Sequence, residues 1–124
     1  MRLSPVATSI ALFFSAQLLT GCASGPIGVI PPTVSSEPAA SVTVERSQSL
    51  LGAPASMLFR IDDRRVYALR FGQQFSFSID PGEYSFGYDL GFNECSRRVL
   101  LDPGQRYLVR LTPVCQIEVT RFGT

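Results

Sequence analysis

The strongest constraint on how this chain folds is a period-two alternation of apolar and polar residues that recurs from Ser41 onward. Successive side chains of a β-strand point to opposite faces of a sheet, so this pattern predicts strands with one buried and one solvated face. No segment of that region shows the 3.6-residue apolar stripe of an amphipathic helix. The runs that we interpret as strands cover residues 41–46, 56–61, 65–71, 74–79, 83–90, 96–101, 106–111 and 116–122. The sequence therefore predicts an all-β domain over residues 41–124, a small antiparallel β-sandwich of about seven or eight short strands.

The clearest alternation lies between Glu83 and Phe92, where large apolar residues occupy every second position. This face is either part of the core or an aromatic docking surface. The chain has 124 residues and is 45% hydrophobic, which suffices for one small core and not for two. The residues of this face are Tyr84, Phe86, Tyr88, Leu90 and Phe92.

Two identical tripeptides, Asp80-Pro81-Gly82 and Asp102-Pro103-Gly104, separate predicted strands. Proline fixes φ at the first central position of a turn and glycine accepts positive φ at the second, so each tripeptide predicts a type II turn. The similarity indicates either an internal repeat or, as we favour with two copies, the same turn chemistry used twice. Asp62-Asp63-Arg64 predicts a further hairpin turn.

The first 21 residues have the pattern of a targeting segment. Arg2 supplies a positive charge, and the apolar stretch 6–19 is shorter than the roughly 20 residues that a membrane-spanning helix needs. The stretch closes on Leu19-Thr20-Gly21-Cys22, which resembles a bacterial lipobox. We therefore predict a lipoprotein signal peptide over residues 1–21, cleavage between Gly21 and Cys22, and acylation, palmitate included, at Cys22. The alternative is a secretory signal followed by a chance cysteine.

A lipid anchor at Cys22 predicts a protein held on a bacterial membrane and facing the periplasm. Ala23 stands where inner-membrane lipoproteins of enteric-type bacteria often carry Asp, which favours the outer membrane. Residues 22–40 are rich in Pro, Gly, Ser and Ala without a periodic apolar face, so we expect a flexible tether there. Ile27, Val29 and Ile30 leave open that this tether docks on a partner or on the domain.

Cys95 and Cys115 remain as a pair, and an oxidising periplasm favours a disulfide between them. If a hairpin at Pro103-Gly104 paired the two strands around it and the last strand continued the same sheet, two strand spacings of about 9.6 Å would separate the two cysteines. That exceeds the roughly 7 Å limit for a disulfide. Either the final strand, 116–122, crosses to the other sheet or the bridge does not form, and we favour the crossing.

Composition excludes most catalytic chemistry. The chain contains no His, which removes the commonest general base and metal ligand. Its serines occur without a Gly-x-Ser-x-Gly elbow, so we expect no enzyme, no cofactor and no metal site. Eleven basic residues face ten acidic ones, and this near-neutral balance argues against a nucleic-acid partner.

The charged residues offer two candidate sites. The close acidic pairs Asp62 with Asp63 and Asp80 with Glu83 are interpreted as turn residues and not as calcium or catalytic carboxylates, because no loop spaces oxygen ligands as an EF-hand does. The arginines either form a patch for lipid A phosphates or peptidoglycan carboxylates or lie on a solvated, charge-balanced face, which we favour. They are Arg60, Arg64, Arg65, Arg70, Arg97, Arg98, Arg106 and Arg110.

The stretch from Met57 to Tyr107 resembles small bacterial lipoproteins of unknown function whose β-domain looks like the PEGA-type, transthyretin-like modules. The resemblance implies a β-sandwich and no particular function, because one fold carries many functions. The literal PEGA tetrapeptide is absent. The residues that carry the resemblance are 59–62, 66–72, 81–84 and 103–109.

Two functional hypotheses follow, and neither is enzymatic. The first is a structural or protein-interaction module of the cell envelope, which meets another envelope protein through its sheet edges or its aromatic face. The alternative is a ligand-binding lipoprotein that holds a glycan, lipopolysaccharide or a lysozyme-type enzyme by its arginines and exposed tyrosines. Oligomeric state and the identity of the partner do not follow from the sequence.

Overall fold

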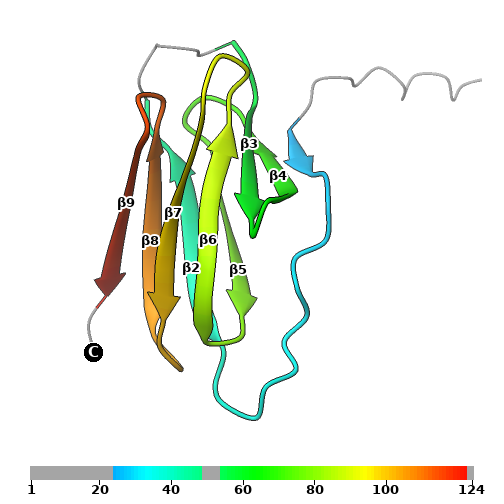
Figure 1. Ribbon diagram of the computed structural model, residues 1–124, viewed down its shortest axis with the longest axis vertical. Coiled ribbons are helices and arrows are strands. Elements are labelled where there is room, and N and C mark those ends of the chain that lie inside the picture. Colours follow the sequence, from blue (N-terminus) through cyan, green and yellow to red (C-terminus); the bar gives the residue numbers. More distant parts are fainter. Residues whose placement is uncertain (1–23, 49–53, 123–124) are drawn as a thin grey trace, which may run out of the picture.

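The computed structural model describes residues 24–48 and 54–122, and these residues form two packed sheets without any helix (Figure 1). No helix of the described ranges is therefore long and apolar enough to cross a membrane. The predicted signal peptide, Gly21 and Cys22 lie outside the described residues. The strands are β1 (Gly25–Pro26), β2 (Ala40–Arg46), β3 (Met57–Ile61), β4 (Arg64–Leu69), β5 (Gln74–Ile79), β6 (Gly82–Asp89), β7 (Glu94–Leu101), β8 (Arg106–Thr112) and β9 (Gln116–Phe122).

The predicted all-β sandwich is confirmed. One sheet has the strand order β1-β4-β3-β6-β7, and the other has the order β5-β2-β8-β9. Each predicted run corresponds to one strand, and β5 and β9 have the predicted bounds. The sheets are not purely antiparallel, because β2 and β8 pair in parallel.

Alternation places the core between the two sheets. Val42 and Val44 of β2 face Phe59 of β3 and Phe86 of β6 across the interior, and all four side chains are essentially inaccessible to solvent. The aromatic alternation of β6 is therefore core and not a docking surface. Phe92 is the exception: it lies in the β6–β7 turn and is 61% exposed.

The β3–β4 turn is the hairpin that the sequence predicts. Ile61 pairs with Arg64, and the two residues between them, Asp62 and Asp63, both have positive φ, 50° and 67°. This is the backbone of a type I′ hairpin, whose twist matches that of the flanking strands. The Asp62 carboxylate accepts the backbone N–H of Ser85 at 2.8 Å, which ties the turn to β6.

The two Asp-Pro-Gly tripeptides do not make hairpins, because each joins a strand of one sheet to a strand of the other. Gly104 has φ 70° and Gln105 N–H donates to the Asp102 carbonyl, as the predicted type II turn requires. Gly82, at φ 149°, is already the first residue of β6, so the turn predicted there is wrong.

The chain crosses between sheets at a different place from the one we predicted. We expected β9 to leave the sheet of β8, but β8 and β9 form a hairpin in which Thr112 pairs with Gln116. The crossing occurs at Pro103-Gly104, between β7 and β8. The hairpin turn is tight because Cys115 has φ 63°, in the left-handed region that a three-residue hairpin loop needs at its last position. Glycine usually fills that position. A cysteine there gives no turn signal, so the sequence does not predict this hairpin.

The segment predicted to be a free tether lies along the sandwich. Gly25 pairs with Ala68 and Pro26 with Tyr67, which makes β1 an edge strand beside β4. Ile30 packs against the core, and the Asp80 carboxylate accepts the backbone N–H groups of residues 34 and 35. In Figure 1 this segment follows the β4 side of the molecule down to the start of β2. Of the three apolar residues that left docking open, Ile30 packs against the core, whereas Ile27 and Val29 are 47% and 83% exposed.

Candidate functional site

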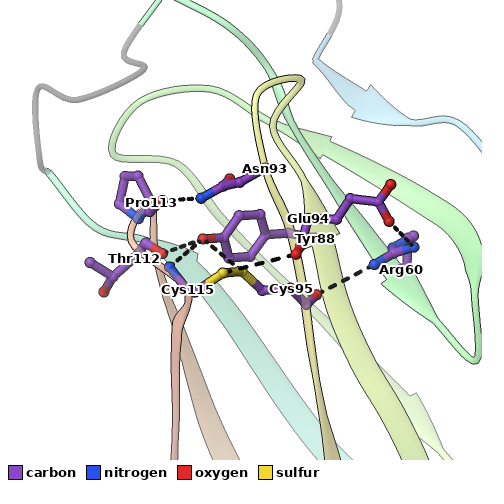
Figure 2. The surroundings of a disulfide bond; sticks show 8 residues. All are labelled: Arg60, Tyr88, Asn93, Glu94, Cys95, Thr112, Pro113 and Cys115. Atoms are coloured by element: carbon purple, nitrogen blue, oxygen red, sulfur yellow. Dashed lines mark hydrogen bonds and ion pairs between the residues drawn. A yellow bond between two sulfur atoms is a disulfide. The ribbon is translucent and has the colours of Figure 1, made fainter.

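The predicted disulfide joins the two sheets at one end of the sandwich. Cys95 lies near the start of β7, and Cys115 closes the β8–β9 turn of the opposite sheet (Figure 2). Their Cα atoms are 5.3 Å apart, within the range that a disulfide spans. The bridge forms although β9 stays beside β8, because the crossing at Pro103-Gly104 has already placed β7 and β8 in different sheets.

Tyr88 holds the same turn from the same sheet. It is the neighbour of Cys95 across the β6–β7 pair, and its buried side chain crosses the interior to the β8–β9 turn. Its hydroxyl donates to the Thr112 carbonyl at 2.6 Å and accepts the backbone N–H of Cys115 at 2.9 Å, and Asn93 Nδ2 donates to the Pro113 carbonyl at 2.8 Å (Figure 2). The hydroxyl thus satisfies two main-chain groups of a turn whose last residue is in a strained conformation. This end of the sandwich is a structural clamp.

A glycine in the middle of β6 lets an arginine cross the outer face of the clamp. Arg60 of β3 reaches over Gly87 to the Glu94 carboxylate, at 3.3 Å, and to the Cys95 carbonyl, at 3.4 Å (Figure 2). A Cβ at Gly87 would overlap the Cys95 carbonyl oxygen and press on the Arg60 guanidinium. Glycine is therefore required here by the close approach of a neighbouring side chain and backbone.

The side of the sandwich between β7 and β9 is the one where a partner can reach both sheets. β7 is the edge of one sheet and β9 is the edge of the other. Two adjoining depressions of about 400 and 260 Å³ lie between them. We call this surface the β7–β9 groove. Its walls include Ser96, Arg97, Val99 and Leu100 from β7, and Ile117, Glu118, Val119 and Arg121 from β9.

The β7–β9 groove combines apolar and basic side chains. Arg97 spans it and donates to the Ile117 carbonyl at 2.8 Å, so one guanidinium bridges the two edges. Leu100, which lines the smaller depression of the groove, is 65% exposed. Edge strands turn every second backbone N–H and C=O away from their own sheet, which makes them templates for an added strand.

The opposite side of the sandwich is covered along one sheet, whereas β5 is the edge of the other. β1 pairs with β4 there, and the rings of Tyr67 and Phe75 stack across the gap between the sheets with centroids 3.8 Å apart. The N-terminal segment and the Tyr67–Phe75 pair therefore lie on the side of the sandwich opposite the β7–β9 groove.

The structure spreads the eight candidate arginines over β3, β4, the β4–β5 loop, β7 and β8, and of these Arg97 and Arg98 line the same depression of the β7–β9 groove. Arg65 pairs with Asp89, Arg98 with Glu83 and Arg110 with Glu45, and these pairs lie on three separate strand pairs. The tyrosines proposed for the ligand-binding alternative are not exposed either. Tyr88 and Tyr107 are buried, and Tyr67 and Tyr84 are partly buried.

The acidic pairs are used in turns and ion pairs. Asp80 accepts backbone N–H groups of the N-terminal segment, while Glu83 binds Arg98, so the two carboxylates do not act together. The hydrogen bond and charge of Arg98 lower the pKa of Glu83. Burial, with the nearby charges of Asp80 and Asp62, raises the pKa of Tyr84. Within residues 24–48 and 54–122, no cluster of Cys, Asp and Glu has the arrangement of a metal site.

One residue of structural importance was not singled out from the sequence. Arg46 is only 2% exposed, and its Nη1 donates to the carbonyls of Ala55, at 2.6 Å, and Leu69, at 2.9 Å. Burial lowers its pKa. The signal was present, because Arg46 follows Val42 and Val44 at the inward positions of the alternation.

Comparison with known proteins identifies a fold and no family. No protein-family model and no curated protein matches the chain. Among solved structures, the chain is similar to the N-terminal domain of AlgF from P. aeruginosa, with 17% sequence identity, a TM-score of 0.51, and coverage of 69% of this chain and 98% of that one. At this identity the likeness shows the fold alone. The resemblance to PEGA-type lipoproteins is supported only as far as the all-β fold.

Proposed function

We propose that this chain is a lipid-anchored, non-enzymatic module of the bacterial cell envelope that binds another envelope protein along its β7–β9 groove. The observation that carries the proposal is that two edge strands from different sheets, with Leu100 exposed beside them, flank an open groove. A partner strand laid there gains main-chain hydrogen bonds from an edge and apolar contact from the walls.

The anchor is the second part of the proposal. It rests on the lipobox-like sequence ending at Cys22 and on the Cys95–Cys115 disulfide, which suits an oxidising compartment. The similarity to the AlgF N-terminal domain supports the β-sandwich fold of this module and no particular role. The structure argues against a ligand site built from arginines and exposed tyrosines, because the tyrosines are buried or partly buried and Arg60, Arg65, Arg98 and Arg110 are held in separate ion pairs.

Site-specific photo-crosslinking in living cells tests the groove. A photoreactive phenylalanine replaces Leu100, and a matched variant carries it at Val34, which is 80% exposed on the N-terminal segment. We expect one discrete protein adduct from position 100 and none from position 34. Equal adducts from both positions, or none from position 100, would contradict the proposal.

A further inference from the structure

The proposed function does not explain one feature at one end of the sandwich. There, the described loops after β4, β6 and β8 each expose one large apolar side chain. Phe71 is 40% exposed in the β4–β5 loop, Phe92 is 61% exposed in the β6–β7 turn, and Val114 is 55% exposed in the β8–β9 turn. We call this the loop end. We propose that the loop end faces a lipid bilayer and that Phe71, Phe92 and Val114 enter its interfacial region.

The strand topology places these three loops at the same end. β4, β6 and β8 finish there, and β5, β7 and β9 start there, as the upper part of Figure 1 shows. Direct contacts agree: Asn93 donates to the Pro113 carbonyl, and Arg46 N–H, at the end of β2, donates to the Gln73 carbonyl at 3.0 Å. The three apolar tips therefore project from one surface of the molecule and not from three.

The charges of the two ends differ in the way that a membrane contact requires. The described loop residues 47–48, 54–56, 70–73, 90–93 and 113–115 contain no carboxylate, and Arg70 is their exposed cation. The carboxylates at the adjoining strand ends, Asp89 and Glu94, are paired with Arg65 and Arg60. The connections at the opposite end carry Asp80 and Asp102, with Glu37 on the chain that approaches them. Phosphate headgroups attract arginine and repel carboxylates, and apolar side chains flanked by a cation bind the interfacial region. The loop end suits a bilayer, and the acidic end does not.

The position of the anchor selects the bilayer over a protein as the occupant; this step rests on the proposed lipidation of Cys22. Gly25 pairs with Ala68 next to the end of β4, so the described chain begins beside the loop end. Only two bonds between successive Cα atoms join Ser24 to Cys22, and an extended chain spans at most about 7 Å over that length. While β1 stays paired, an acylated Cys22 holds the loop end against the membrane surface.

Tryptophan fluorescence tests the inference cleanly, because the chain contains no Trp. The lipidated full chain carrying Phe92→Trp is reconstituted into vesicles of phosphatidylcholine and phosphatidylglycerol with brominated acyl chains. The matched control carries Phe122→Trp, which replaces a ring that is 41% exposed at the far end of β9. We expect a blue-shifted spectrum and severalfold stronger quenching for Phe92→Trp than for Phe122→Trp. Val114→Trp serves as a second reporter of the loop end and should be quenched in the same way.

The outcomes separate this inference from the proposed function. A chain that co-sediments with vesicles but is quenched equally at positions 92, 114 and 122 keeps the anchor and overturns the membrane-facing loop end. A chain that does not co-sediment contradicts the anchor itself, and the inference falls with it.

Discussion

Removing the hydroxyl of Tyr88 should destabilise the domain by more than the loss of one hydrogen bond, because this hydroxyl serves two main-chain groups. The Tyr88→Phe substitution keeps the buried ring and removes the donor to the Thr112 carbonyl and the acceptor of the Cys115 N–H. Each of these bonds contributes about 1 kcal/mol, and a main-chain group left without a partner away from water costs about 1–3 kcal/mol. We therefore expect a loss of about 2 kcal/mol, or a fall in Tm of about 10 °C for a domain of this size.

Urea unfolding of the oxidised chain from Ser24 onward measures this loss as a shift in midpoint at constant slope. Tyr107→Phe is the matched control, because the Tyr107 hydroxyl accepts one backbone hydrogen bond, from the Asp102 N–H at 2.7 Å, whereas the Tyr88 hydroxyl serves two backbone groups. The control should lose about half as much stability. A loss for Tyr88→Phe that is no larger than that of Tyr107→Phe would refute the clamp.

The disulfide and Tyr88 hold the same turn, so their contributions should be coupled. The disulfide closes a loop across a sequence separation of 20 residues and should stabilise the fold by about 3 kcal/mol in the chain-entropy model. In a chain where Cys95 and Cys115 are both alanine, the turn is free to move toward water. Tyr88→Phe should then cost about 1 kcal/mol less than in the oxidised protein. Full additivity would show that the two contacts act independently.

Three further perturbations test other parts of the structure. Gly87→Ala should lower the free energy of unfolding by about 1–3 kcal/mol, because the new methyl group overlaps the backbone of β7. Urea unfolding measures this loss, and an unchanged midpoint would contradict the close approach at Gly87. Ile30→Ser should lower stability by about 1 kcal/mol if the N-terminal segment packs as described, whereas the exposed control Val29→Ser should lower it little. Arg98 lowers the pKa of Glu83, so the stabilisation from this pair is present at neutral pH and is lost as the pH falls from the ordinary Glu pKa through the lowered one. In Arg98→Gln, NMR titration of the carboxyl group should show a higher pKa for Glu83. An unchanged pKa would contradict the pairing.

The strands could be predicted from the sequence because burial on one face imposes alternation. The same alternation puts Phe86 and Tyr88 on one face, and the structure shows that this face is core. The two-residue strand Gly25–Pro26 could not be found in this way, because its pairing with β4 depends on the docking of Ile30 and on no local periodicity. A segment rich in Pro and Gly is typical of a linker, and here tertiary contacts override that composition.

The order of the strands required information that the sequence does not display. The β8–β9 hairpin depends on a left-handed Cys115, and a non-glycine residue there gives no turn signal. The sequence predicts the Cys95–Cys115 pairing correctly, but it assigns the crossing between sheets to the β8–β9 connection instead of the β7–β8 connection. The β7–β9 groove arises only when β7 and β9 become edges of different sheets, so no run of residues could have predicted it.

We propose that a lipid at Cys22 anchors this sandwich to the membrane. The most direct test is the intact mass of the mature protein, isolated from bacterial cells grown with labelled palmitate, for the wild type and for Cys22→Ser. We expect a wild-type chain that begins at Cys22 and carries labelled acyl groups, and a Cys22→Ser chain without label that keeps its signal peptide or is released from the membrane. An unlabelled wild-type chain, or a Cys22→Ser chain that is acylated and membrane-bound like the wild type, would contradict it.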